Sequence, residues 1–124
     1  MKKLEFFFMI IVVSILVTGC EKQPAKITLL NPAIDIGDVA LNSKKEFYVY
    51  FKNDGEENLE ILNLRPSCKC FVGKEYKLTV PPKAKDSIQV TFRAKDLGES
   101  EETLVLVSNT KPGFDLIKVK SNTK

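Results

Sequence analysis

The chain has 124 residues, which is enough for one small domain with a single hydrophobic core. Its formal net charge of +3 is too mild to indicate nucleic acid as a partner. The sequence contains no histidine, so it lacks a Ser-His-Asp or Cys-His nucleophile pair, and its six glycines are scattered at turns instead of forming a phosphate-binding loop. These features favour a binding or structural protein without a cofactor over an enzyme.

The first 19 residues have the pattern of a bacterial export signal. A short basic start precedes an apolar run over residues 6–17, which is shorter than the roughly 20 residues that a membrane-spanning helix needs. Val17-Thr18-Gly19-Cys20 resembles the lipobox of bacterial lipoproteins. The resemblance implies that Cys20 becomes the first residue of the mature chain and carries acyl groups that hold it to a membrane. The alternative is an ordinary signal peptide cut after Gly19, or an uncleaved anchor.

The mature chain divides into a short tether and one domain. Residues 20–26 contain the lipidated cysteine and a polar stretch with Pro24 and no apolar period, which is typical of a linker. Residues 27–124 form the domain. We expect the protein in the bacterial cell envelope, anchored to a membrane through Cys20 and facing the periplasm, with another envelope protein as its partner.

Short strands separated by turns follow one another from residue 26 onwards. Apolar and β-branched residues alternate with polar ones, and turn signals such as Asn53-Asp54-Gly55 separate the runs. We expect about seven strands and an eighth near the C-terminus, at residues 26–30, 34–40, 45–52, 58–64, 76–80, 86–94, 101–108 and 114–121. This spacing predicts an all-β sandwich whose two sheets share one core.

The alternation also predicts which side chains face the core. Phe47, Val49 and Phe51 share one face of the third predicted strand, and Tyr48 and Tyr50 share the other. We expect a second sheet or a loop to cover the two tyrosines. In the alternative, they stand on an exposed face and anchor a partner.

The order of four segments resembles a known bacterial family. The segments are IDIGDV (34–39), FYVYFKNDGEENLEILNLRPSCKC (47–70), LTVPPKAKDSIQVTFRA (78–94) and LVLVSN (104–109). This order resembles the domain of unknown function 1573, whose members are similar to Hydin-type and major-sperm-protein domains and are common as lipoproteins of Bacteroidetes-type bacteria. The resemblance implies an immunoglobulin-like antiparallel β-sandwich and an envelope location, but no activity. The chain departs from the family pattern at Lys69, where glycine is usual between the two cysteines.

Cys68 and Cys70 are the candidate site, because Cys20 is assigned to lipid and oxidation is permitted outside the cytoplasm. In a structural interpretation, they are small buried groups or a plain disulfide. A bond across so short a loop removes only about 1.6 kcal/mol of chain entropy. It would also be strained in an extended strand, which favours a redox role. Arg65 and Lys69 would favour the thiolate in that role if they lie close to it.

A metal site is the third interpretation of the pair. A structural zinc site takes four ligands, and here carboxylates would have to supply the rest, although none directly flanks Cys68 or Cys70. Two thiolates suit Cu(I). We therefore expect a lipid-anchored envelope protein with a non-enzymatic, immunoglobulin-like binding or scaffolding domain. The alternative is an accessory protein that handles thiol–disulfide exchange or Cu(I) through Cys68 and Cys70.

Overall fold

The computed structural model describes residues 19, 21–72 and 76–124, and these residues form strands and connections without any helix. Within this part of the chain there is thus no helix long and apolar enough to cross a membrane. The nine strands are β1 (Ile27–Leu29), β2 (Ala33–Val39), β3 (Lys44–Asn53), β4 (Leu59–Pro66), β5 (Phe71–Val72), β6 (Leu78–Val80), β7 (Lys85–Arg93), β8 (Gly98–Ser108) and β9 (Phe114–Thr123). Residues 1–18 of the predicted signal peptide and Cys20 lie outside the described residues.

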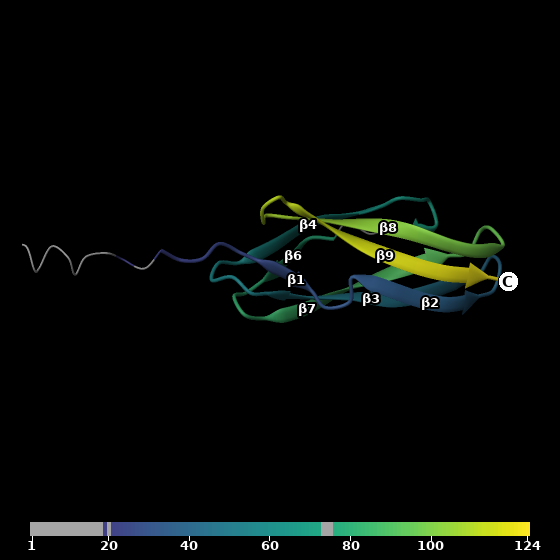
Figure 1. The fold of residues 1–124 in the computed structure, drawn as a ribbon, viewed down its shortest axis with the longest axis horizontal. Helices are drawn as coiled ribbons and strands as arrows, with labels where there is room; N and C mark the ends of the chain where they lie inside the picture. Colours follow the sequence, from purple (N-terminus) through teal and green to yellow (C-terminus); the bar gives the residue numbers. More distant parts are fainter. Residues whose placement is uncertain (1–18, 20, 73–75) are drawn as a thin grey trace, which may run out of the picture.

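The strands form two stacked sheets (Figure 1). One has four strands in the order β1-β3-β7-β5, and the other has five in the order β2-β9-β8-β4-β6. The predicted all-β sandwich is confirmed, but two details differ from the expectation. The described part has nine strands because the chain adds the two-residue strand β5, which is too short to show a pattern. The sandwich is also not wholly antiparallel, since the chain changes sheets after β1 and β2 then runs parallel to β9.

The core lies between the two sheets and follows the predicted alternation. Phe47, Val49 and Phe51 of β3 are buried. In β9, Ile117 and Val119 are buried, while the lysines between and beside them are exposed. Apolar side chains at every second position thus give each sheet one face that packs against the other.

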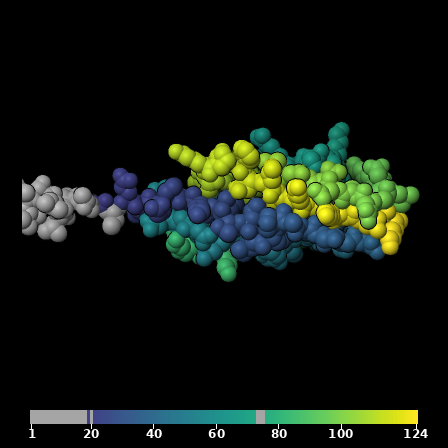
Figure 2. Space-filling model, viewed as in Figure 1, coloured from purple at the N-terminus to yellow at the C-terminus, as the bar shows by residue number. Residues whose placement is uncertain are grey.

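The strand directions define two ends of the sandwich. At the N-terminal end lie the connections β3–β4, β6–β7 and β8–β9. At the opposite end, which we call the cysteine end, lie the connections β2–β3, β4–β5 and β7–β8 and the C-terminus. Figure 2 shows the described N-terminal segment leaving the body at one end, with the C-terminal strand reaching the other.

The segment predicted as a tether contacts the domain from Gln23 onwards. The backbone N–H of Gln23 donates to the Glu56 carboxylate at 3.0 Å, and the backbone N–H of Glu56 donates to the Gln23 carbonyl at 3.1 Å. Gly55 lies directly beneath this segment, and a Cβ there would stand 2.8 Å from the Cα of Ala25. Only glycine allows so close an approach of the two backbones.

One buried amide closes the N-terminal end of the sandwich. The Asn53 side chain is fully buried, and its nitrogen donates to the carbonyls of Glu57 and Val80 at 2.7 and 3.1 Å. Its oxygen accepts from the backbone N–H groups of Lys26 and Gly55 at 3.3 and 3.0 Å. One side chain therefore connects the start of β1, the β3–β4 turn and β6.

Candidate functional site at the cysteine turn

The candidate cysteines lie in a turn that passes from one sheet to the other. Residues 67–70 connect β4 of the five-stranded sheet with β5 of the four-stranded sheet. Ser67 fixes the first end of the turn, because its backbone N–H donates to the Thr103 carbonyl and its hydroxyl accepts from the Thr103 N–H, both at 2.9 Å. The Cys70 carbonyl fixes the second end by accepting from the Arg93 N–H at 2.6 Å. The turn is thus held by β8 and by β7.

The two cysteines are joined as a disulfide. Their Cα atoms are 5.3 Å apart, within the usual range for a disulfide. The expectation of a strained bond assumed an extended strand, and that assumption is wrong because the pair lies in a turn. Lys69 does not have a positive φ, so this turn does not need a glycine between the two cysteines.

The fold also brings a carboxylate to the pair that the sequence did not indicate. Glu102 of β8 faces Cys68 and Cys70, and the three ligand atoms lie within 4.8 Å of one another. All three residues are half-buried. The Ser67 hydroxyl donates to Oε2 of Glu102 at 2.7 Å and so orients the carboxylate. The contact results from the antiparallel β4–β8 pairing, which places Pro66 opposite Leu104. The sequence pattern predicts the strands but not which strands pair, so it could not predict this contact.

A pocket of about 260 Å³ opens beside the cysteine turn. Besides the two cysteines and Glu102, charged side chains of Lys69, Lys95 and Asp96 line it. A small molecule or the side chain of a partner can therefore reach the sulfur atoms from this side. Arg65, which the sequence also suggested as a neighbour, is exposed and does not line the pocket.

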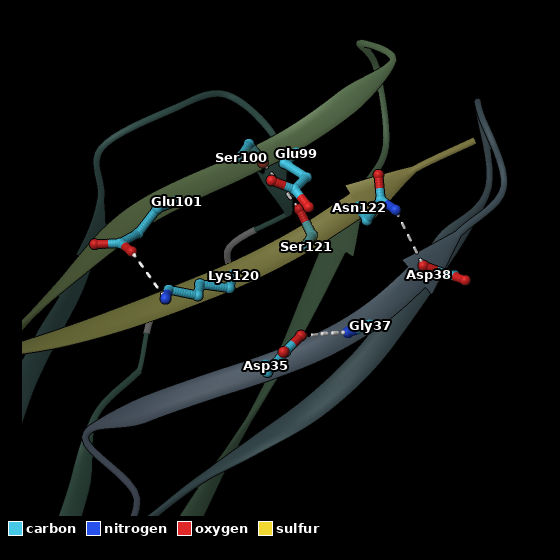
Figure 3. Close-up of a pocket in the computed structure, with 9 residues that line it drawn as sticks. All are labelled: Asp35, Gly37, Asp38, Glu99, Ser100, Glu101, Lys120, Ser121 and Asn122. Atoms are coloured by element: carbon cyan, nitrogen blue, oxygen red, sulfur yellow. Dashed lines mark hydrogen bonds and ion pairs between the residues drawn. The ribbon is translucent and has the colours of Figure 1, made fainter.

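A second hollow of about 530 Å³ shares Glu99 and Ser100 with this pocket (Figure 3). It lies where the pairing of β2 with β9 shifts register between Asp35 and Asp38, and the Asp35 carboxylate accepts from the Gly37 N–H at that point. Its polar groups mostly bond one another, as in the pairs Ser100–Ser121, Asn122–Asp38 and Lys120–Glu101. At its edge, a hydrogen bond from Lys124 lowers the pKa of Asp38. Most polar groups that line the hollow therefore already have a partner within it.

The third feature is a pair of aromatic rings on the outer face of the four-stranded sheet. The prediction that Tyr48 and Tyr50 are covered is wrong, since they are 45% and 47% exposed. Their rings stack with centroids 6.0 Å apart. The Asn31 side chain bonds the Tyr48 carbonyl and the Tyr50 N–H at 2.8 and 2.7 Å, beyond the end of β1. It takes the place of a neighbouring strand at this point of β3.

Comparison with known proteins supports the fold but gives no activity. The family model described as "Protein of unknown function (DUF1573)" matches residues 27–123. A protein of unknown function from Porphyromonas gingivalis W83 is similar in structure, with a TM-score of 0.68 and 11% identity. The match covers 85% of this chain and 50% of that one, so this chain spans half the length of that protein. A search of curated proteins gives no match.

Two further solved structures have the same type of sandwich. The ASH/PapD-like domain 7 of human CEP192 matches with a TM-score of 0.66 and 12% identity, covering 87% of this chain and 92% of that domain. A chain of the CsuC–CsuE chaperone–tip adhesion subunit pre-assembly complex of Acinetobacter baumannii matches with a TM-score of 0.59 and 12% identity, covering 81% and 58%. At such identities the similarity establishes only an immunoglobulin-like sandwich. Because the family model covers nearly the whole described domain, the chain belongs to the protein family of unknown function DUF1573.

Proposed function

We propose that this chain is a lipid-anchored protein of the bacterial cell envelope whose sandwich binds another envelope protein without catalysing a reaction. The observation that supports binding is the stacked, exposed pair Tyr48 and Tyr50. Tyrosines offer a large, rigid contact area with a hydroxyl at the tip, and they are enriched at protein interfaces. Isolated exposed apolar residues need no explanation, but two stacked aromatic rings on one strand form a surface to which a partner protein can bind.

The surroundings of the tyrosines support a protein partner. Directly across the sheet, Tyr48 is paired with Gln89 and Tyr50 with Ser87, so the positions opposite the rings are polar and uncharged. Glu46, the neighbour of Tyr48 on the same face of β3, is charged and accepts a hydrogen bond from the Gln89 side chain at 2.6 Å. The rings thus have a polar rim, as the centres of protein interfaces do. The similarity to a chain of a chaperone–adhesion subunit complex supports the proposal because such a sandwich there takes part in a complex between proteins.

Site-specific photo-crosslinking in cells tests the binding proposal. A photoreactive amino acid replaces Tyr48 in the full chain, and a matched variant carries it at Leu116, which is 53% exposed on the five-stranded sheet. We expect one dominant envelope-protein adduct from position 48, weakened by Tyr50→Ser, and none of the same mass from position 116. Absence of an adduct at position 48, or the same adducts from both positions, would contradict the proposal.

Lipid anchoring needs its own test because Cys20 lies outside the described residues. We expect cells fed labelled palmitate to label the full chain, and Cys20→Ser to abolish the label. A variant that replaces Cys68 and Cys70 by serine controls for acylation elsewhere. Undiminished label in Cys20→Ser would disprove the anchor. The alternative function, thiol–disulfide or Cu(I) handling by the cysteine pair, stays a prediction.

A further inference from the structure

The cysteine turn combines three groups that bind metals well. The carboxylate of Glu102 lies 32 or more sequence positions from the two cysteines, yet the three ligand atoms lie within 4.8 Å of one another. Glu102 lies on the core-facing side of β8, where Ser100, Leu104 and Leu106 also point, while the neighbouring Glu101 faces solvent. The packing of the core does not require the half-buried carboxylate of Glu102 to lie beside two sulfur atoms.

The ligand set favours zinc among the common metals. Zn²⁺ is bound by thiolates and carboxylates, at about 2.3 Å and about 2.0–2.2 Å respectively, and it accepts three protein ligands with a water in the fourth position. The pocket beside the turn leaves room for that water. A site of two sulfurs alone would suit Cu(I) instead, so the contribution of Glu102 distinguishes the two metals.

The groups around the three ligands are also suited to a metal site. The Ser67 hydroxyl donates to Oε2 of Glu102, while its own oxygen accepts from the Thr103 N–H. Such a contact fixes the orientation of a ligating carboxylate and leaves its second oxygen for the ion. Two thiolates and a carboxylate around Zn²⁺ carry one net negative charge, and the same pocket is lined by Lys69 and Lys95 together with Asp96 and Glu99.

We propose that reduction of the Cys68–Cys70 disulfide opens a zinc site formed by Cys68, Cys70 and Glu102. A dithiol reductant supplies two electrons and two protons, the sulfur–sulfur bond breaks, two thiols form, and the reductant becomes a disulfide. Zn²⁺ then displaces the two thiol protons, which go to solvent, and both sulfurs bind the ion as thiolates. The disulfide form cannot supply thiolates and therefore does not bind, so the redox state controls metal binding.

Zinc titration of the full chain in mild detergent tests this proposal. The protein is reduced with a phosphine, which offers no thiol to the metal, and a chromophoric chelator competes for Zn²⁺. We expect one Zn²⁺ per reduced chain and none at the same site for the oxidised chain, which is an unmutated control. Co²⁺ in place of Zn²⁺ should give thiolate-to-cobalt charge-transfer absorption in the reduced chain only.

Two adjacent glutamates provide matched variants. We expect Glu102→Gln to weaken zinc binding at least about tenfold, and Ser67→Ala to weaken it by about tenfold, as outer contacts of metal sites commonly do. Glu101→Gln should bind as the unmodified chain does, because Glu101 pairs with Lys118 and Lys120 on the opposite face. Far-ultraviolet circular dichroism checks that each variant is folded. No zinc uptake by the reduced chain, or equal affinity in Glu102→Gln, would overturn the proposal.

Discussion

The two ends of the sandwich are closed in different ways. At the N-terminal end, the buried Asn53 side chain makes four hydrogen bonds to separate segments, and Gly55 lets the chain ahead of β1 pack against the β3–β4 turn. At the cysteine end, hydrogen bonds to β8 and β7 hold only the two ends of the turn, a pocket lies beside it, and Leu97 is exposed. The comparison suggests that the N-terminal end provides stability, while the cysteine end can change its covalent state at little cost to the fold.

The largest effect should come from removing the amide at the N-terminal end. Asn53→Leu leaves four backbone groups without their partner, and each unsatisfied buried group costs about 1–3 kcal/mol unless water reaches it. We expect a loss of about 3 kcal/mol or more in the free energy of unfolding, measured by urea denaturation. Asn58→Ala, at an exposed asparagine of the same connection, should change it by less than about 0.5 kcal/mol. Equal effects of the two substitutions would show that Asn53 is not central.

A side chain at Gly55 should detach the segment that precedes β1. Gly55→Val would place atoms where the backbone of residues 24–26 now lies, and overpacking of this kind costs about 2 kcal/mol. We expect amide hydrogen exchange at Ala25 and Lys26 to be faster than in the unmodified chain, with a smaller change in the core strands, as measured by mass spectrometry on the full chain. Unchanged exchange at those residues would mean that the two backbones do not pack as closely as described.

Opening the disulfide should affect stability less than either change above. The bond closes a loop of three residues, so the chain-entropy model gives it at most about 1.6 kcal/mol. We expect Cys68→Ser with Cys70→Ser to lower the free energy of unfolding by no more than this, and phosphine reduction of the unmodified chain to do the same. A larger loss than for Asn53→Leu would reverse the comparison between the two ends.

The smallest effects should be electrostatic, and they too should differ between the ends. The pKa of Asp54 at the N-terminal end is lowered most by a hydrogen bond from Thr28 and next by a hydrogen bond from Lys52. Lowered pKa values stabilise the fold above the ordinary pKa of 3.8, and this contribution is lost as the pH falls through the folded value. Asp54→Asn and Asp38→Asn should therefore each flatten the loss of stability on acidification.

Of these two substitutions, we expect Asp54→Asn to have the larger effect. The side chains of the Lys52–Asp54 pair are 34% and 33% exposed, whereas those of the Lys124–Asp38 pair are 67% and 63% exposed and better screened by water. Urea denaturation at several pH values between neutrality and pH 3 measures how steeply the free energy of unfolding falls with pH in each variant. A steeper acid loss in either variant than in the unmodified chain would contradict the direction worked out here.

The fold could largely be predicted from the sequence because alternation is a local property. Phe47, Val49 and Phe51 were expected to be buried together, and they are. The exposure of Tyr48 and Tyr50 could not be predicted, because alternation says that two side chains share a face but not whether another layer covers it. The same limit applies to Glu102, since its approach to the cysteines depends on which strands pair and in which register.

The docking of Gln23 onto Glu56 determines how far the protein can extend from its anchor. Only Glu21 and Lys22 remain between the docked residue and Cys20, and three residue steps span at most about 10 Å. With the anchor proposed for Cys20, the N-terminal end would stand almost on the lipid headgroups. The ten residues of β3 rise by about 3.3 Å each, so the cysteine turn would face away from the membrane at a nearly fixed height. Whatever reduces the disulfide, or delivers zinc to it, would have to act at that height above the bilayer.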